Sequence, residues 1–197
     1  MIYLDHAASS PIRESVLKEL RDSFESDAAN PSAIHKLGKY QQASLLKAKI
    51  SFLKSLSKER SVLSDQFIFT SSATESNTTI IQGLSLNKDD QVFYSEGDHP
   101  SLVQNAKKLQ DQGIIIKAMA LTNQGLVDEE WLAKNLSSSV KLLLISHVNN
   151  HNGSLQDLGS LSKLIKDKSP QCHLHIDAVQ SYGSFEIDVV DLNIDSL

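Results

Sequence analysis

Seven hydroxyl side chains crowd the start of one expected helix. The stretch FTSSATESNTTIIQGL, residues 69–84, passes from an apolar, strand-like segment into hydroxyl-bearing residues and then into an apolar pattern typical of a helix. The hydroxyl residues are Thr70, Ser71, Ser72, Thr74, Ser76, Thr78 and Thr79. Small hydroxyl residues commonly cap helices, but hydroxyls and free backbone N–H groups at a helix start can also hold a phosphate. The string lacks the glycines and the Gly-Lys pair of a Walker loop, so capping and phosphate binding both stay open.

Polar residues with possible chemistry follow other apolar segments. Asp177 ends the segment CHLHID, where a carboxylate can keep a bound pyridinium nitrogen protonated or can simply cap a helix. His99 can stack on a ligand ring or move protons near neutral pH, or it is an exposed loop histidine. Asn149 and Asn150 are adjacent, a pattern that most often makes a turn.

Histidine spacing raises metal binding as a competing function. His147 and His151 are four residues apart, and His173 and His175 are two apart, which places the second pair on one face of a strand. The four-residue spacing suits a helix, whereas the surrounding sequence is typical of a loop, so we predict no metal site. The single cysteine, Cys172, is interpreted as a small buried hydrophobe.

Apolar segments alternate with helix-like segments from residue 66 onward. The expected strands are QFIFT, QVFYS, IIIKAMAL, VKLLLIS and CHLHID, and the expected helices between them cover residues 74–84, 100–112, 128–136 and 155–168. Continuous apolar strands that alternate with helices indicate a parallel sheet covered on both faces. Ligands of such sheets bind beyond the carboxyl ends of the strands, and four of these ends carry the polar strings TSSATES, EGDHPS, SHVNNHNG and DAVQSYG. We therefore predict a three-layer α/β/α fold with a mostly parallel sheet, whose site lies where these four loops converge.

Two further helices are expected nearer the N-terminus. The first covers Pro11 to Ser26, with Ser10 as its cap and Pro11 in its first turn. The second is a long helix over residues 40–56. The string NPSAIHKLG between them is expected to be a loop, because the residue before a proline resists helix.

Composition and charge exclude several classes of protein. The 197 residues include 19 Lys and Arg against 24 Asp and Glu, a net charge of −5, without the basic block that nucleic-acid binding needs. A single cysteine favours a reducing compartment. The start, MIYLDHAASSP, lacks the features of a secretory signal, and no apolar run approaches membrane-spanning length. We expect a cytoplasmic protein without nucleic-acid or membrane partners.

Six short motifs together resemble the NifS/IscS-type cysteine desulfurases. They are YLDHAASSP, NPSAIHKLG, FTSSATESN, DHP, HVNNHNG and HIDAVQSYG, in the family's order and with comparable spacing across essentially the whole chain. The resemblance implies a pyridoxal 5′-phosphate (PLP) enzyme of fold type I, in the class V aminotransferase-like superfamily. Residues 29–197 would then form an incomplete PLP-binding large domain. Residues 1–28 would form an N-terminal arm and helix, which packs with the small domain in the family.

The resemblance also assigns roles to individual residues. Carried over by position, Ala73 and Thr74 hold the cofactor phosphate. His99 stacks over the pyridine ring and helps to move protons, which makes it the expected catalytic residue. Asp177 pairs with the ring nitrogen.

Asn150 and Gln180 are implied to contact the side of the ring that carries the phenolic oxygen. The implied reaction converts L-cysteine to L-alanine and passes the sulfur, as a persulfide, to an acceptor protein in iron–sulfur cluster assembly or tRNA thiolation. Family members are homodimers with active sites near the subunit interface, so a homodimer is expected here.

Three positions depart from the family pattern. His6 stands where asparagine is usual, Ser72 where glycine is usual, and His151 where glutamate is usual. Ser72 either adds a phosphate donor or strains a turn in which glycine tolerates positive φ. His151 removes a carboxylate from the rim of the expected site.

The residues that carry covalent chemistry in the family are not matched in this sequence. The Schiff-base lysine of the family follows shortly after the segment that matches DVVDLNIDSL, and the persulfide cysteine lies further along. The last lysine here is Lys168, and Cys172 does not match the nucleophile. We therefore expect the chain alone to be inactive, with part of its sheet missing. Two other functions stay open: a non-catalytic relative that binds a ligand or partner, and another class V reaction such as selenocysteine lysis or amino-acid aminotransfer.

Overall fold

A computed structural model describes residues 2–26, 29–58 and 67–197 of the chain. The chain divides into two compact units, each described by itself below. The first unit comprises Met1–Ser55 with Arg60–Phe67, and the second comprises Leu56–Glu59 with Ile68–Leu197. The expected division after residue 28 stays a prediction.

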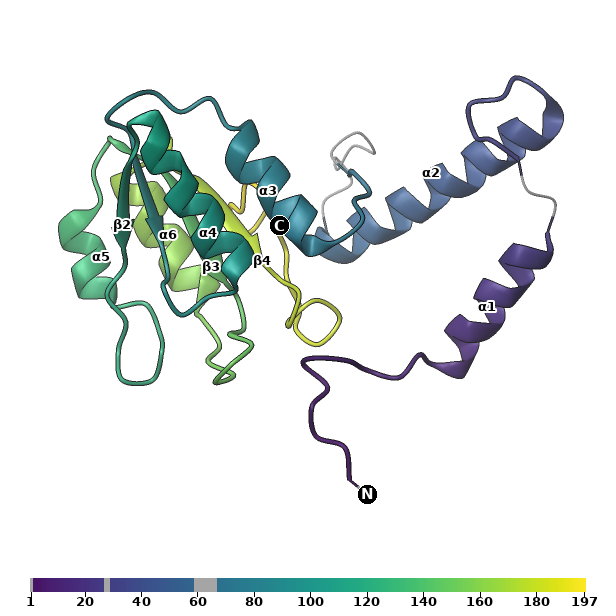
Figure 1. Cartoon of the computed structure of the whole chain (residues 1–197), viewed down its shortest axis with the longest axis horizontal. Coiled ribbons are helices and arrows are strands. Elements are labelled where there is room, and N and C mark those ends of the chain that lie inside the picture. Colours follow the sequence, from purple (N-terminus) through teal and green to yellow (C-terminus); the bar gives the residue numbers. More distant parts are fainter. Residues whose placement is uncertain (1, 27–28, 59–66) are drawn as a thin grey trace. The chain divides into compact units, whose positions relative to one another are not determined.

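The second unit is built on a four-stranded parallel sheet (Figure 1). Its strands are β1 Gln91–Tyr94, β2 Ile115–Ala118, β3 Val140–Ser146 and β4 His173–Asp177, in the order β2-β1-β3-β4. The β3–β4 register pairs Leu142 with His173 and Ser146 with Asp177, so both strands end at the same edge of the sheet. Four of the five expected strands are confirmed.

The fifth expected strand, QFIFT, is wrong over its described residues. Gln66 lies outside the described residues, and the segment from Phe67 to Thr70 is not part of any strand. The side chain of Ile68 is 72% exposed and that of Phe69 is 57% exposed. An apolar run becomes a strand only where a neighbouring strand takes up its backbone hydrogen bonds, and the sheet of the described residues consists of β1 to β4 without this segment.

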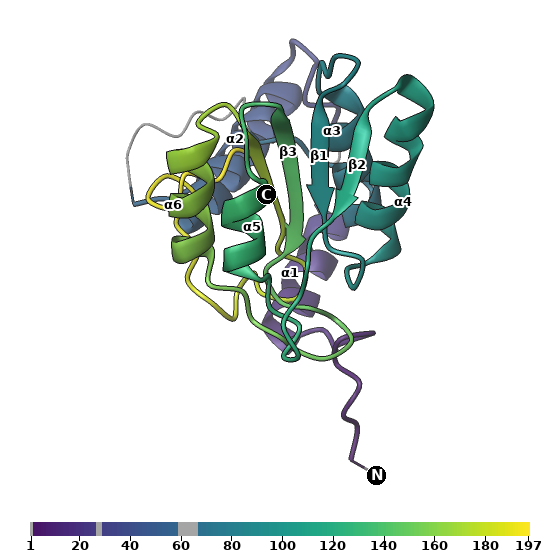
Figure 2. The same cartoon turned by 90° about the vertical axis from the view of Figure 1, so that its left-hand side faces the viewer.

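Helices cover both faces of the sheet, which confirms the three-layer α/β/α architecture. They are α3 Ala73–Gly83, α4 Pro100–Lys108, α5 Glu129–Asn135 and α6 Leu158–Lys168, and a 3-10 turn at Leu109–Gln112 extends α4. Figure 2 shows α3 and α4 on one side of the sheet and α5 and α6 on the other.

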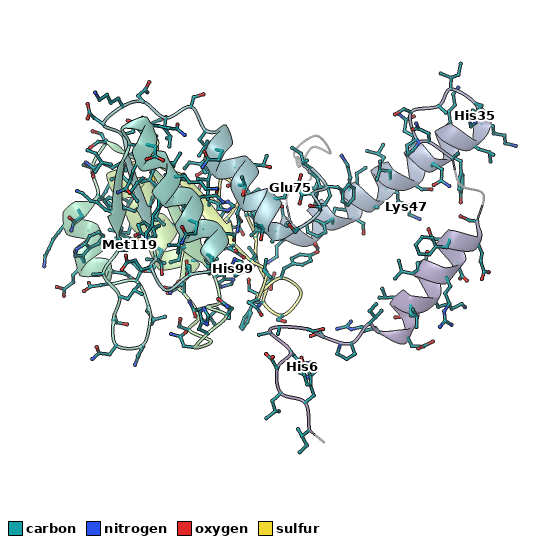
Figure 3. The ribbon with its side chains drawn as sticks, in the orientation of Figure 1. His6, His35, Lys47, Glu75, His99 and Met119 are labelled. Carbon is teal, nitrogen blue, oxygen red and sulfur yellow. The ribbon has the colours of Figure 1, made fainter. Side chains whose placement is uncertain are left out.

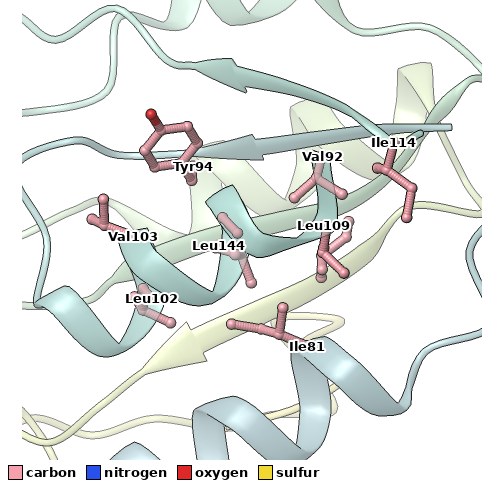
Figure 4. Close-up of a cluster of buried hydrophobic side chains, with 10 residues drawn as sticks. Ile81, Val92, Tyr94, Leu102, Val103, Leu109, Ile114 and Leu144 are labelled. Carbon is pink, nitrogen blue, oxygen red and sulfur yellow. The ribbon is translucent and has the colours of Figure 1, made fainter. Parts of the chain in front are cut away.

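The core on the α3–α4 side holds the site-bearing helices against the sheet (Figure 4). Ile81 of α3 and Leu102 of α4 are fully buried and pack in one cluster with Val92 and Tyr94 of β1 and with Leu144 of β3. On the opposite face, Phe93 and Trp131 pack with ring centroids 5.5 Å apart. The side chains of alternate residues in β1 therefore pack against the two opposite helix layers, as strand geometry requires.

The first unit contains the two expected helices, α1 Glu14–Glu25 and, apart from its last residue, α2 Lys36–Leu56. The prediction that Ser10 caps α1 is wrong. The helix begins three residues later, with Arg13 in the cap position, and the Ser10 hydroxyl donates to the carbonyl oxygen of His6 instead. The expected loop is also shorter, because α2 already begins at Lys36.

Gly38 has a steric reason to be glycine within the first turns of α2. A Cβ at this position would lie 2.3 Å from the carbonyl oxygen of Ala33, far inside van der Waals contact. The motif NPSAIHKLG therefore packs its loop directly against the start of the helix.

Within the described parts of the chain, no helix is both long and apolar enough to cross a membrane.

Replacing Ile81 by alanine tests whether the cluster anchors α3. Because Ile81 is fully buried, we expect Ile81→Ala to lower the free energy of unfolding by about 2–5 kcal/mol, the usual cost of such a cavity. Urea denaturation followed by circular dichroism measures this loss. The neighbouring Ile80 is only partly buried, so Ile80→Ala is the matched control and should cost less. Equal losses in the two variants would contradict the packing described here.

Candidate active site

Hydrogen bonds join the loops that follow β1 and β3. The Asp98 carboxylate accepts a hydrogen bond from the backbone N–H of Ser146 at 2.7 Å. In return, the Asn149 side chain donates to the carbonyl oxygen of Gly97 at 2.7 Å. These contacts bridge about 50 residues of sequence and fix the two loops side by side at the carboxyl edge of the sheet.

Further hydrogen bonds add the end of β4 and the helix α3 to the same edge. The backbone N–H of His147 donates to the carbonyl oxygen of Asp177 at 3.0 Å. The side-chain amide of Asn77, in α3, donates to the Asp177 carboxylate at 3.0 Å. The four polar loops thus converge as the sequence predicts.

The N-terminus of α3 is both capped and available to an anion. Ser72 is the cap, and its hydroxyl accepts from the backbone N–H of Glu75 at 3.3 Å. The Glu75 carboxylate accepts from the backbone N–H and the hydroxyl of Ser71, and these bonds lower its pKa. Within the described residues, the backbone N–H groups of Ala73 and Thr74 have no hydrogen-bond acceptor. Capping and phosphate binding are therefore compatible, because they use different N–H groups.

Ser72 does not strain the turn. Its φ of −168° and ψ of 161° are extended backbone, which any residue adopts. The family glycine is consequently not needed here for positive φ. Of the two effects considered for Ser72, strain is ruled out.

His99 is more than a loop histidine, because it caps α4. Its Nδ1 accepts a hydrogen bond from the backbone N–H of Ser101 at 3.2 Å and lies 2.8 Å from the Ser101 hydroxyl oxygen. Figure 3 labels His99 at the start of α4 and Glu75 in the first turn of α3. The histidine remains exposed to solvent, so its ring is anchored at one nitrogen and accessible to a ligand.

Asp177 is buried, which distinguishes it from a surface charge. One carboxylate oxygen accepts from Asn77, and the other accepts from the backbone N–H of Val179 at 3.0 Å. Asp177 is 9% exposed, and these two hydrogen bonds hold its carboxylate in position without a ligand.

The two adjacent asparagines have different surroundings. Asn149 is buried, and its Oδ1 accepts from the backbone N–H groups of His151 and Asn152, which closes the turn that the sequence predicts. Asn150 and Gln180 are only partly buried. The side chain of Asn149 is thus engaged within the loop, and the cofactor contacts expected of Asn150 and Gln180 stay predictions.

Burial shifts the pKa values of one carboxyl and two imidazole groups in this part of the sheet, each toward its neutral form. Burial raises the pKa of Asp98 to about 6, although the hydrogen bonds from Ser146 and Asn149 partly oppose it. Burial lowers the pKa of His175 to about 4, so this imidazole is neutral at pH 7. Burial also lowers the pKa of His147.

Sequence reasoning missed three residues that hold the site together: Asn77, Asp98 and Ser101. A signal for Asn77 was present, because it lies four residues before Ile81 and so occupies the buried face of its helix. A polar residue on an apolar face needs buried hydrogen-bond partners. Which partners it finds depends on segments 24 and 100 residues away.

The histidine pair on β4 is held by a serine. His173 Nε2 and His175 Nδ1 lie 2.7 and 2.8 Å from the hydroxyl oxygen of Ser196, so the two rings share one face of the strand as expected.

Among the described residues, no group of three or more His, Cys, Asp or Glu side chains could hold a metal ion. Cys172 is buried, as interpreted from the sequence, and burial raises its pKa to about 12.

The fold and the converging loops define a class of protein. Residues 2–197 match the model of the family described as aminotransferase class-V, and the chain belongs to this family. Its fold is the fold type I α/β fold of PLP-dependent enzymes, and several solved structures share it. One is a NifS-like protein, which superposes with a TM-score of 0.88 at 24% identity over 98% of this chain and 53% of the other.

Curated relatives of the chain carry the name cysteine desulfurase. The chain is 30% identical to cysteine desulfurase IscS of Dictyoglomus turgidum, covering 100% of this chain and 49% of the relative. It is 29% identical to the putative cysteine desulfurase IscS 1 of Bacillus subtilis, covering 100% and 51%. A solved structure described as SspA in complex with cysteine is 26% identical, with a TM-score of 0.83, over 98% of this chain and 55% of the other. The chain thus spans about half the length of the relatives it matches.

The residues present fit PLP, the cofactor on which this family depends. PLP carries a phosphate and a ring nitrogen, which need hydrogen-bond donors and a carboxylate respectively. The unengaged N–H groups of Ala73 and Thr74 supply the first requirement. The buried and doubly anchored Asp177 supplies the second.

The raised pKa of Asp98 predicts a measurable pH dependence of stability. The ordinary value of 3.8 is raised to about 6 in the folded protein, so between about pH 4 and pH 6 the folded state binds more protons than the unfolded state. The contribution of Asp98 to the free energy of unfolding is therefore highest below pH 4, and it falls by about 3 kcal/mol as the pH rises through 6. His175, whose pKa is lowered, acts in the opposite sense over the same range.

The Asp98 contribution is consequently read as the difference in unfolding free energy between wild type and Asp98→Asn at pH 4 to 8. We expect this difference to change across the range, and the Asp98 carboxyl carbon to titrate near pH 6 by NMR. Titration near pH 4 would show that the carboxyl is not buried as described.

Proposed function

We propose that the chain is a cysteine desulfurase-like protein that holds PLP with the loops at the carboxyl edge of its sheet. The observation that carries the proposal is the contact of Asn77 with Asp177. It ties the carboxylate expected at the ring nitrogen to the helix whose N-terminus is expected at the phosphate. The two ends of the proposed cofactor site are thus held by adjacent, directly bonded elements.

Each residue has a defined task in this proposal. Ala73 and Thr74 donate to the phosphate, and the dipole of α3 favours its negative charge. Asp177 keeps the ring nitrogen protonated, while His99 covers the ring face and moves protons. Asn150 and Gln180 orient the ring at its phenolic oxygen. When bound, PLP supplies an electron sink for chemistry at the α-carbon of an amino acid.

L-Cysteine is the proposed substrate of the complete reaction, and the resemblance and the relatives' names support it. The homodimer, the sulfur-acceptor protein and the cytoplasmic location implied by the resemblance belong to the same proposal. The reaction needs a lysine that joins PLP and a cysteine that takes the sulfur. The four loops contain neither: the strings TSSATES, EGDHPS, SHVNNHNG and DAVQSYG have no lysine and no cysteine.

Cys172 cannot serve as the sulfur acceptor within the chain. It lies directly before β4, at the opposite edge of the sheet from Asp177, and is 1% exposed. Burial raises the pKa of its thiol to about 12, and the thiol form is a poor nucleophile.

The first functional prediction is that the 197-residue chain binds PLP without a covalent bond. Absorbance and fluorescence titration should show saturable binding, and borohydride treatment should attach no cofactor at the site. Asp177→Asn should weaken binding by about tenfold or more, because a hydrogen bond to a charged group contributes about 1.5–3 kcal/mol. Asp167→Asn, at an exposed position of α6, is the matched control and should leave binding unchanged.

Inorganic phosphate should compete with PLP in the same titration if the N-terminus of α3 holds the phosphate group. Equal affinities for wild type and Asp177→Asn, with circular dichroism showing both folded, would contradict the assignment of Asp177. Absence of any saturable binding would contradict the proposed pocket as a whole.

The second functional prediction is that the chain alone releases no sulfide from L-cysteine in the presence of PLP. The physical reason is the lack of a lysine in the four loops and the burial of Cys172. Sulfide is measured by methylene blue formation, with free PLP as the blank. Release in proportion to protein concentration would contradict this prediction. PLP binding without sulfide release agrees both with this proposal and with the alternative of a non-catalytic, ligand-binding relative.

A further inference from the structure

A chain of hydrogen bonds, buried at Asn77, runs from β4 to the exposed His99. Asn77, in α3, is 3% exposed, and its side chain bonds to residues of β4 and α4. Its Nδ2 is 3.0 Å from the Asp177 carboxylate and 2.9 Å from the Ser101 hydroxyl oxygen, and its Oδ1 is 3.0 Å from His175 Nε2.

The orientation of the Asn77 amide follows from its partners. An ionised carboxylate only accepts hydrogen bonds, so the NH₂ group must face Asp177, and the carbonyl oxygen must face His175. His175 therefore donates from Nε2 and accepts from the Ser196 hydroxyl at Nδ1. The lowered pKa of His175 agrees with a neutral ring that carries a single proton.

The orientation of Asn77 in turn sets the Ser101 hydroxyl. Ser101 has one O–H to donate, and its oxygen receives an N–H from Asn77. The Ser101 hydroxyl then donates to His99 Nδ1, 2.8 Å away. The backbone N–H of Ser101 points at the same nitrogen, at 3.2 Å, and this group can only donate.

We infer that Asn77 and Ser101 are positioning residues that connect Asp177 to His99 and hold His99 as its Nε2–H tautomer. Two donors occupy Nδ1, so the ring proton resides on Nε2, the nitrogen left to meet a ligand. The inference deepens the proposed function and rests on it for the identity of that ligand. In that setting, one relay fixes two of the groups expected to contact the PLP ring, Asp177 and His99, and His99 presents a proton donor rather than a base.

The test is a two-bond ¹H–¹⁵N NMR spectrum of the 197-residue chain at pH 8, without any ligand. His99 is assigned by the loss of its signals in His99→Gln. We expect a pyridine-like nitrogen at Nδ1 and a pyrrole-like nitrogen at Nε2. A pyrrole-like Nδ1 would overturn the inference.

The variants identify what sets the tautomer. Ser101→Ala removes one donor to Nδ1, and we expect the ratio of the Nε2–H to the Nδ1–H tautomer to fall about fivefold, the equivalent of one ordinary hydrogen bond. Asn77→Ala frees the Ser101 oxygen to accept from His99, and the ratio should fall in the same direction. Ser101→Thr keeps the hydroxyl and should restore the wild-type ratio. Ser160→Ala removes a first-turn hydroxyl of α6 that donates to Glu129, and it should change nothing.

A relay that does not exist gives a distinct result. If Ser101→Ala and Asn77→Ala, with native-like backbone amide spectra, show the same His99 nitrogens as Ser160→Ala, the relay is refuted. If Asn77→Ala does not give such a spectrum, Ser101→Ala and Ser101→Thr decide alone. Because no PLP is present, this failure is separate from a failure of cofactor binding, which the titration of wild-type chain with PLP reports.

Discussion

The arrangement of the site depends on one buried amide, the side chain of Asn77. It donates to Asp177 and Ser101 and receives from His175, so all three of its polar contacts are made inside the protein. A buried polar group without partners would cost about 1–3 kcal/mol. The helices α3 and α4 and the strand β4 therefore have to meet at one place for the fold to tolerate this residue. The proposed phosphate, ring-face and ring-nitrogen contacts lie on those same three elements.

A second constraint comes from the parallel sheet. Its strands all end at one edge, and the loops there are bonded to each other through Asp98, Ser146, Asn149 and Gly97. The apolar cluster beneath α3 and α4 keeps the helices at a fixed distance from the strands. A site assembled in this way is rigid before a ligand binds, which reduces the entropy lost on binding.

Electrostatics at the edge follow from the same burial. Asp98 and His175 are displaced in opposite directions, and each is displaced toward its neutral form, because burial penalises charge. The Asp177 carboxylate accepts a hydrogen bond from the side chain of Asn77 in α3. The proposed cofactor would place a positive ring nitrogen beside this carboxylate. The exposed His99, in contrast, is oriented by its hydrogen bonds to Ser101.

The covalent steps of the proposed reaction are the part of the function that the four loops do not provide. They supply anion donors, a carboxylate and an imidazole, but no lysine or cysteine. The chain matches the cysteine desulfurases along its whole length while spanning about half of theirs. Holding the cofactor and performing the reaction are consequently separate properties, and they are tested separately.

The sequence by itself determined the alternation of strands and helices, the three-layer class and the convergence of four polar loops, because periodicity and strand-end chemistry are local properties. Its motifs also led to the family that the comparisons then showed. Tertiary structure alone decided that QFIFT is not a strand over residues 67–70, that Ser10 does not cap α1, and that it is Asn149 whose side chain closes the loop after β3. It alone revealed which groups Asn77 and Ser101 bond to. Each of these outcomes depends on which distant group accepts or donates a hydrogen bond, and a local pattern carries no information about that partner.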